Sequence, residues 1–257
     1  FNHGIPFIAY SGILKKILYL FENLNCLFST EIITISYAMK KILLEISSKK
    51  ISIIANGSAC GIELYNPVDF KKDKQSLRNN MGFRSDDKII LFVGRANKRK
   101  GFYDIIEIWN KYLIFNPNFK LILLGIRKSD ILKFYEQIPN NIFPMSFITN
   151  PEKIFLISDY LLVTSYHEGL NYSVIESMLS KTLVISNNIS GVSEIIKNNI
   201  NGFLVNNNNH EEFFKCIMKC EKNVSLRNSI LKNGLMSVKK YDRKVFLKEY
   251  LAYLSKL

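Results

Sequence analysis

The stretch KIILFVG at residues 88–94 is an uninterrupted apolar run that ends in glycine, and it decides the fold. Such a run is typical of a parallel strand that is buried on both faces. From residue 88 to residue 205, predicted strands alternate with predicted helices. The strands are 88–94, 119–125, 142–147, 160–165, 182–186 and 202–205, and the helices are 101–115, 128–138, 151–157, 173–181 and 191–197. This alternation predicts an α/β fold with a doubly wound parallel sheet.

The segments on either side of this region are simpler. Upstream, a helix over 11–28, a strand over 31–36, a helix over 37–46 and a strand over 50–56 follow β-α-β order, and a polar, charge-rich stretch at 69–88 marks the expected domain junction. Downstream, residues 210–257 predict helices only. We expect three parts: residues 1–70, residues 71–241 and a final helix over 242–257.

The composition is that of a folded, basic protein. Of 257 residues, 47% are hydrophobic and 22% are charged, which excludes a disordered chain. The 35 basic and 22 acidic side chains give a net charge of +13, which favours nucleic acid, nucleotides or an anionic membrane surface as partners. The four cysteines are too few and too scattered for a disulfide framework, so we expect buried thiols in a reducing cytoplasm.

A cluster of basic residues follows the strand at 88–94. In VGRANKRKGF, four cations lie between Gly94 and Gly101, just before a helix. Gly94 allows the backbone to approach a ligand closely, and Arg95 and Lys100 could then hold a diphosphate. The G-x-x-x-x-G-K-[ST] pattern of a phosphate-binding loop is absent. A solvated basic loop is the alternative.

Two carboxylates follow the strand at 160–165, in SYHEGLNYSVIESMLS. Seven residues separate Glu168, which lies in a loop, from Glu176, which lies in the next helix. One carboxylate suits sugar hydroxyls and the other suits a ribose diol, while the amides that precede the helix would favour a phosphate. The alternative is that Ser173 and Glu176 form a capping box, since they fit S-x-x-E.

These motifs resemble the family-4 retaining glycosyltransferases (glycosyl transferases group 1), which have the two-domain B-type fold. The family pattern E-G-x-x-x-x-x-x-E is met by Glu168 to Glu176, and V-G-R…K-G by residues 93–95 and 100–101. Residues 191–196 and 201–205 are similar to its G-G-x-x-E-I-I and N-G-x-L-V stretches, with Ser190 in place of the first glycine. Residues 56–64 resemble N-G-S-x-x-G-I-D-L, with glutamate for aspartate. The resemblance is to enzymes that extend lipid-linked glycans for capsule, O-antigen or protein glycosylation.

The resemblance implies a role for each matched residue. Arg95 and Lys100 would hold the donor diphosphate, Glu176 the ribose and Glu168 the donor sugar. Further contacts to the sugar and phosphate would come from backbone groups of Gly94, Gly169, Leu170, Asn171 and Tyr172. His3, in an H-G context, would reach the donor sugar, although a loop histidine without a role is the alternative. No metal and no cofactor are implied, because the nucleotide sugar is the substrate.

The resemblance also implies how the chain is divided. Residues 1–70 would be a remnant of the N-terminal acceptor domain, 71–241 the complete nucleotide-sugar domain, and 242–257 the helix that closes back onto the first domain. The expected partners are a UDP-sugar and a glycan or polyprenyl-linked acceptor. Peripheral contact with an anionic inner membrane face through the helix at 11–28 is left open beside ordinary core packing of that helix. We expect no nucleic acid, because no binding motif is found.

Two other interpretations remain open. An epimerase of the same architecture would also bind a nucleotide sugar, but it would lack the pattern formed by Glu168 and Glu176. A truncated fragment would bind the nucleotide without transferring sugar.

Overall fold

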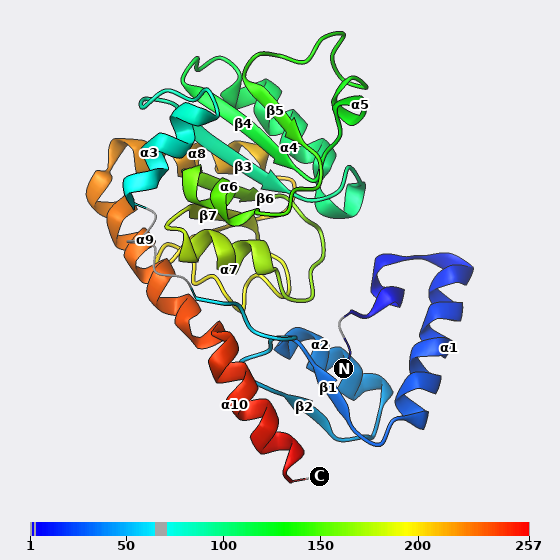
Figure 1. The fold of residues 1–257 in the computed structure, drawn as a ribbon. Coiled ribbons are helices and arrows are strands. Elements are labelled where there is room, and N and C mark those ends of the chain that lie inside the picture. The colour runs from blue at the N-terminus through cyan, green and yellow to red at the C-terminus, as the bar shows by residue number, and fades with distance from the viewer. Residues whose placement is uncertain (1, 3, 65–70, 257) are drawn as a thin grey trace.

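The computed structural model describes residues 2, 4–64 and 71–256, which form two lobes (Figure 1). The C-terminal lobe holds a six-stranded sheet with the order β5-β4-β3-β6-β7-β8, and the N-terminal lobe holds the pair β1-β2. All strand pairs in both sheets are parallel. The strands are β1 (Ile32–Thr34), β2 (Ile51–Ile53), β3 (Lys88–Val93), β4 (Phe119–Leu124), β5 (Ile142–Met145), β6 (Tyr160–Val163), β7 (Leu183–Asn187) and β8 (Phe203–Val205). The α/β fold with a doubly wound parallel sheet is thus confirmed.

Helices pack around the six-stranded sheet and also form part of the N-terminal lobe (Figure 1). They are α1 (Gly12–Phe28), α2 (Tyr37–Ile46), α3 (Lys71–Asn80), α4 (Phe102–Ile108), α5 (Lys128–Ile131), α6 (Glu152–Ile157), α7 (Tyr172–Leu179), α8 (His210–Lys222), α9 (Val224–Val238) and α10 (Arg243–Leu254). Short 3₁₀ or π segments are η1 (Pro6–Ala9), η2 (Lys98–Lys100), η3 (Trp109–Leu113) and η4 (Lys239–Tyr241). None of the helices in the described part of the chain is long and apolar enough to cross a membrane.

Two local predictions were wrong. The segment 191–197 forms turns instead of a helix, with Gly191 at a φ of +80° and successive bonds back to the carbonyl of Ile189. The helix expected over 128–138 ends at Ile131 and continues as turns. The polar stretch at 69–88 contains α3, which packs against α6, and its interpretation as a domain junction stays a prediction.

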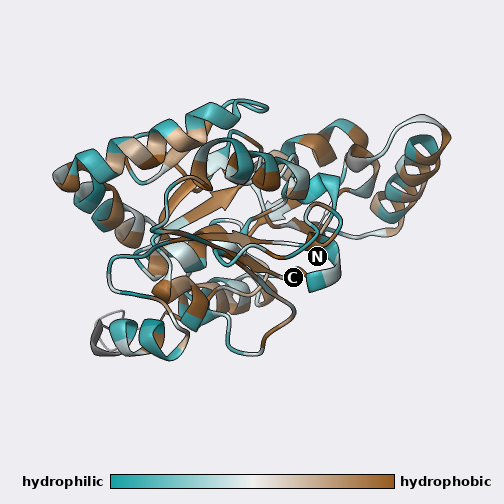
Figure 2. Ribbon diagram, turned by 90° about the horizontal axis from the view of Figure 1, so that it is seen from above, coloured by the Kyte–Doolittle hydropathy of each residue, from teal (hydrophilic) through white to brown (hydrophobic). Residues whose placement is uncertain are grey.

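The apolar run in β3 is buried on both sides, as its sequence indicates. Ile89 and Leu91 belong to one core cluster, whereas Ile90 and Phe92 belong to the other, and none of the four is more than 1% exposed. Burial of each such side chain contributes about 1.5–3 kcal/mol. Figure 2 shows the hydrophobic strands running between the helices on either side. The strand therefore forms the centre of the lobe.

The strand order also places the loops that carry the predicted site. From β3 the chain goes outward through β4 to β5, and it then returns to the other side of β3 with β6. The loops after β3 and β6 therefore lie next to each other at the carboxyl edge of the sheet, where parallel sheets of this kind bind their ligands.

The last helix joins the two lobes. After α9, which lies along the C-terminal lobe, α10 runs beside β2 of the N-terminal lobe (Figure 1). Glu249 on α10 accepts a hydrogen bond from the amide of Ala55 at 2.9 Å, and Phe246 packs against Ile54 and Ala55. The division of the chain at residues 70 and 241 stays a prediction.

Candidate functional site

The loop at residues 94–101, called here the basic loop, has a fixed backbone. The side chain of Asn97 accepts a hydrogen bond from the amide of Lys100 at 3.0 Å and so caps η2. Gly101 has a φ of +67°, and a Cβ atom there would lie 2.0 Å from the carbonyl oxygen of Thr164. Only glycine fits this position, because it tolerates both the left-handed backbone and the close approach. Lys100 is thereby held beside the end of β6.

The loop at residues 165–171, called here the acidic loop, leads into α7. Asn171 caps this helix, since its side chain accepts a hydrogen bond from the amide of Val174 at 3.3 Å. Ser173 is inside the helix and is not its cap, so the capping-box interpretation of Glu176 was wrong. Glu168 is only 7% exposed. A carboxylate so far removed from water requires a partner.

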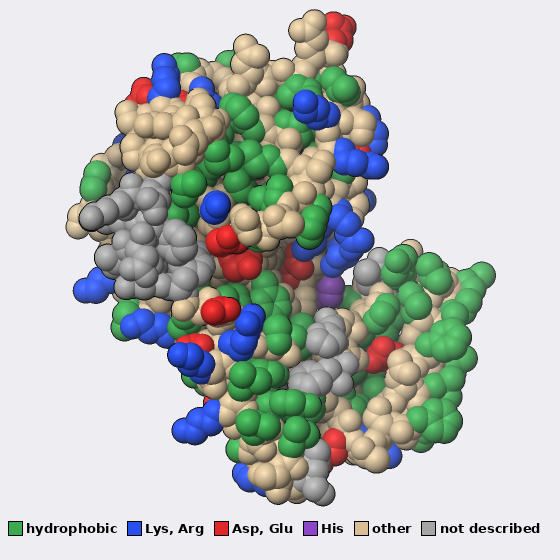
Figure 3. Space-filling view, viewed as in Figure 1, with side chains coloured by type: hydrophobic (Ala, Val, Ile, Leu, Met, Phe, Trp, Pro, Cys, Tyr) green, Lys and Arg blue, Asp and Glu red, His purple; other side chains and the backbone are tan. Residues whose placement is uncertain are grey.

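That partner comes from the basic loop. The ammonium group of Lys100 lies 2.7 Å from Oε1 of Glu168. The backbone of the two loops is joined as well, because the amide of Tyr166 donates to the carbonyl of Arg99 at 2.9 Å. The two motifs that the sequence singled out therefore meet. Figure 3 shows acidic and basic side chains facing each other in the hollow between the lobes.

A pocket of about 270 Å³ adjoins this ion pair. Gly94, Arg95 and Lys100 line it together with apolar side chains at the ends of β3 and β4 and in the loop after β5. The apolar members are Val93, Leu124, Phe147, Ile148 and Pro151. Phe147 is 91% exposed, so its ring is free to contact a bound molecule. Cations beside an apolar wall suit a phosphorylated ligand that also carries a flat ring.

The ionisation of Glu176 is strongly affected by its surroundings. Burial raises its pKa to about 7, and the charge of Glu152 adds to the effect. The side chain therefore carries a proton about half of the time at neutral pH. His167, which precedes Glu168, is half-buried, and burial lowers its pKa although the adjacent carboxylate opposes the shift.

The other predicted positions lie in the same region or outside the description. Leu170 and Asn171 are buried in the acidic loop, Gly169 is half-buried beside them, and Tyr172 begins α7. His3 lies outside the described residues, and its role stays a prediction. His210 was interpreted as a solvated helix start, but its Nε2 lies 2.9 Å from Oδ1 of Asp104.

Sequence reasoning missed two side chains that bridge the lobes. Glu194 accepts hydrogen bonds from the amides of Tyr37 and Ala38 in the N-terminal lobe, and the hydroxyl of Tyr172 contacts Ser58 and the amide of Ala59. Glu194 lies in a stretch that was noted only for its similarity to a family motif, and no local sequence pattern indicates its partner.

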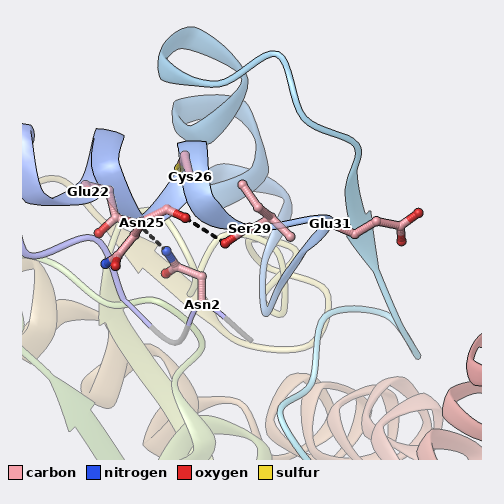
Figure 4. Close-up of a pocket in the computed structure, with 7 residues that line it drawn as sticks. Asn2, Glu22, Asn25, Cys26, Ser29 and Glu31 are labelled. Atoms are coloured by element: carbon pink, nitrogen blue, oxygen red, sulfur yellow. Dashed lines mark hydrogen bonds between the residues drawn. The ribbon is translucent and has the colours of Figure 1, made fainter.

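A second pocket, of about 290 Å³, lies in the N-terminal lobe (Figure 4). Its lining residues are Asn2, Glu22, Asn25, Cys26, Ser29, Glu31 and Ile32. Asn2 donates to Glu22 at 2.6 Å, and burial raises the pKa of Glu22. Of the predicted site residues that the structure describes, none lines this pocket. Within the described residues, no group of three or more His, Cys, Asp or Glu side chains is placed to hold a metal ion.

Comparison with known proteins gives consistent matches. The model of the family described as "Glycosyl transferases group 1" matches residues 73–235. The chain is 27% identical over 258 residues to the capsular polysaccharide biosynthesis glycosyltransferase CapM of Staphylococcus aureus, covering 96% of this chain and 67% of CapM. It is 25% identical to N-acetylgalactosamine-N,N'-diacetylbacillosaminyl-diphospho-undecaprenol 4-alpha-N-acetylgalactosaminyltransferase of Campylobacter jejuni, covering 93% of this chain and 67% of that protein.

The fold is shared with solved structures. The crystal structure of Anabaena HepE in complex with UDP-glucose matches 99% of this chain and 71% of its own, with a TM-score of 0.82 at 18% identity. The two-domain B-type fold expected from the sequence is thus confirmed. The chain spans about half to two thirds of the length of the curated relatives that it matches.

Proposed function

The chain belongs to the glycosyl transferases group 1 family, and on that premise we propose that it moves a sugar from a nucleotide-diphosphate donor, a UDP-sugar, to a glycan or polyprenyl-linked acceptor. The reaction would retain the configuration of the donor sugar, need no metal ion and serve the synthesis of cell-surface polysaccharide.

The observation that carries this proposal is the ion pair between Lys100 and Glu168 at 2.7 Å. It joins the basic loop to the acidic loop beside the pocket that Gly94 and Arg95 line. A cation and a carboxylate in one place suit the two ends of a nucleotide sugar, because the diphosphate is anionic and the sugar carries hydroxyl donors.

Each residue then takes one part of the donor. Arg95 and Lys100 bind the diphosphate, and Glu168 accepts hydrogen bonds from the sugar hydroxyls. Glu176 accepts from the ribose diol. Backbone amides of Gly169, Leu170, Asn171 and Tyr172 donate to the sugar and the phosphate. Without the donor, Lys100 pairs with Glu168, so that the buried carboxylate is not left without a partner.

The chemistry follows from the charge that develops on the leaving group. As the bond between the anomeric carbon and the phosphate oxygen breaks, its electron pair stays on the diphosphate. Arg95 and Lys100 stabilise this negative charge electrostatically. The acceptor oxygen forms the new bond on the same face of the sugar, and its proton passes to an oxygen of the departing phosphate. No carboxylate nucleophile takes part in this scheme.

Two observations support the acceptor part of the proposal. The name of the Campylobacter jejuni relative specifies a sugar chain on diphospho-undecaprenol. In this chain, one face of α1 exposes eight apolar side chains, beside the exposed residues Lys15 and Lys16. These are Ile13, Leu14, Ile17, Leu20, Phe21, Leu24, Leu27 and Phe28. An exposed apolar face on a helix that also carries exposed lysines suits the surface of an anionic membrane, here its cytoplasmic face.

The test of the proposed function is a thermal-shift screen of nucleotide sugars, with UDP-glucose and UDP-N-acetylglucosamine beside their GDP and ADP counterparts. We expect UDP-sugars to raise the melting temperature of the unchanged chain and not that of the double variant Arg95→Ala, Lys100→Ala. Equal shifts in both proteins, or no shift with any nucleotide sugar, would contradict the assignment.

A further inference from the structure

We propose that Glu194 is a positioning residue that connects the acidic loop with the N-terminal lobe, so that donor binding and the closed arrangement of the two lobes support each other. This inference rests on the proposed function, because the donor is taken to be a nucleotide sugar bound at the acidic loop.

Glu194 binds the start of a helix in the opposite lobe. Its Oε2 accepts from the amide of Tyr37 at 2.9 Å and its Oε1 accepts from the amide of Ala38 at 2.7 Å. These are the first two residues of α2, whose amides have no carbonyl partner within the helix. A carboxylate at a helix N-terminus is also favoured by the helix dipole. Tyr37 is 157 residues away in the sequence, so this contact ties two distant segments together.

The turn that carries Glu194, residues 188–196, is packed against the acidic loop on its other side. Gly191 has a φ of +80°, and a Cβ atom there would lie 2.2 Å from the carbonyl oxygen of Gly169 and 2.7 Å from that of Glu168. The side chain of Asn187, just before the turn, donates to the carbonyl of Thr164 at 2.9 Å. Backbone packed so closely transmits a displacement instead of absorbing it. A shift of the acidic loop therefore moves Glu194.

A second contact runs from the acidic loop to the N-terminal lobe. The hydroxyl of Tyr172 accepts from the amide of Ala59 at 2.8 Å and shares a hydrogen bond with the hydroxyl of Ser58 at 3.1 Å. Tyr172 directly follows the acidic loop, so the end of this loop is attached to the opposite lobe as well. The contacts of Glu194 and of Tyr172 are both present in this arrangement of the lobes.

The consequence is that donor binding and the contacts between the two lobes are thermodynamically linked. A nucleotide sugar that orders the acidic loop also fixes the two groups that hold the N-terminal lobe. Conversely, loss of these contacts leaves the loop less well fixed for the donor. Linkage of this kind is reciprocal, and it typically changes affinity by about fivefold or more.

The experiment measures amide hydrogen exchange with and without saturating UDP-glucose. In the unchanged chain, UDP-glucose should slow exchange both in the acidic loop and at the amides of Tyr37 and Ala38. In Glu194→Ala the loop should still be protected, but α2 should no longer respond, and UDP-glucose should bind about fivefold more weakly. Tyr172→Phe should reduce the response of the segment around Ala59. Glu211→Gln, an exposed glutamate on α8, is the matched control and should behave as the unchanged chain.

Each result has a defined meaning. Protection of α2 by UDP-glucose in Glu194→Ala, or its absence in an unchanged chain that does bind UDP-glucose, would overturn this inference and leave the proposed function standing. Failure of the unchanged chain to bind UDP-glucose would remove both. If Glu194→Ala does not fold, Glu194→Gln keeps one acceptor oxygen and must show a smaller response of α2 than the unchanged chain. An equal response would overturn the inference.

Discussion

Lys100 and Glu168 are 68 residues apart in the sequence, yet their side chains form an ion pair of 2.7 Å at the carboxyl edge of the large sheet. The pair exists because β3 and β6 are neighbours in the sheet and because Gly101 lets the basic loop approach the end of β6. Breaking such a pair by removing one partner leaves an uncompensated charge, which is costly in a buried place. A bound donor that interacts with both groups avoids that cost.

Glu168 and Glu176 are proposed to contact different parts of the donor, so replacing each should weaken the binding of different ligands. Glu176→Ala removes the proposed ribose contact and should weaken both UDP and UDP-glucose by about tenfold. Glu168→Ala removes the proposed sugar contact, so it should leave the affinity for UDP nearly unchanged and weaken UDP-glucose only. Isothermal titration of both ligands into both variants measures this. Equal loss of UDP affinity in the two variants would refute the division of roles.

The affinity for UDP-glucose should rise with pH around neutrality. The pKa of Glu176 is raised to about 7, and only its ionised form accepts hydrogen bonds with both oxygens. Affinity should therefore increase about tenfold from pH 6 to pH 8. UDP-glucose is the suitable ligand, because both of its phosphates are esterified and do not titrate in this range. The matched variant Glu176→Gln should show a flat profile, and a flat profile in the unchanged chain would contradict the role of Glu176.

The same shift predicts a change in stability of the ligand-free chain. The folded-state pKa of Glu176 lies above its ordinary value of 4.5, so the folded state holds the proton more tightly. The free energy of unfolding should then fall as the pH rises from about 4.5 to about 7, by on the order of 3 kcal/mol. Glu176→Gln should lose this part of the pH dependence in denaturant titrations.

Binding of the donor should survive removal of divalent cations. Arg95 and Lys100 are proposed to neutralise the diphosphate, so EDTA should leave the affinity for UDP-glucose within about twofold. Arg95→Ala should weaken it by about tenfold or more, because a charged hydrogen bond contributes about 1.5–3 kcal/mol. Loss of binding in EDTA that magnesium or manganese restores would show that a metal ion does this work.

The strands and their parallel arrangement were predictable from the sequence, but several details were not. The residues from Ile89 to Phe92 are buried on both faces of the sheet, and this burial is visible in the sequence as an uninterrupted apolar run. The glycine that ends the strand is visible there as well. The turn at 191–197 has helical periodicity, but its conformation is decided by Gly191 against the acidic loop and by the distant partner of Glu194. Such long-range contacts override local preference.

The candidate site, too, was predictable from the sequence only in part. Arg95, Lys100, Glu168 and Glu176 could be found from their positions after two strands, because strand ends share one edge of a parallel sheet. The ion pair itself, the raised pKa of Glu176 and the contacts of Tyr172 depend on how the loops pack. No spacing in the sequence encodes these properties.

The most direct test of the central claim is isothermal titration of UDP-glucose into the unchanged chain and into Lys100→Met. The claim is that the ion pair of Lys100 and Glu168 marks a nucleotide-sugar site. It predicts one molecule bound per unchanged chain and binding at least about tenfold weaker in the variant, because a charged contact to the diphosphate is lost. Equal affinity in the two proteins, or no binding to the unchanged chain, would contradict it.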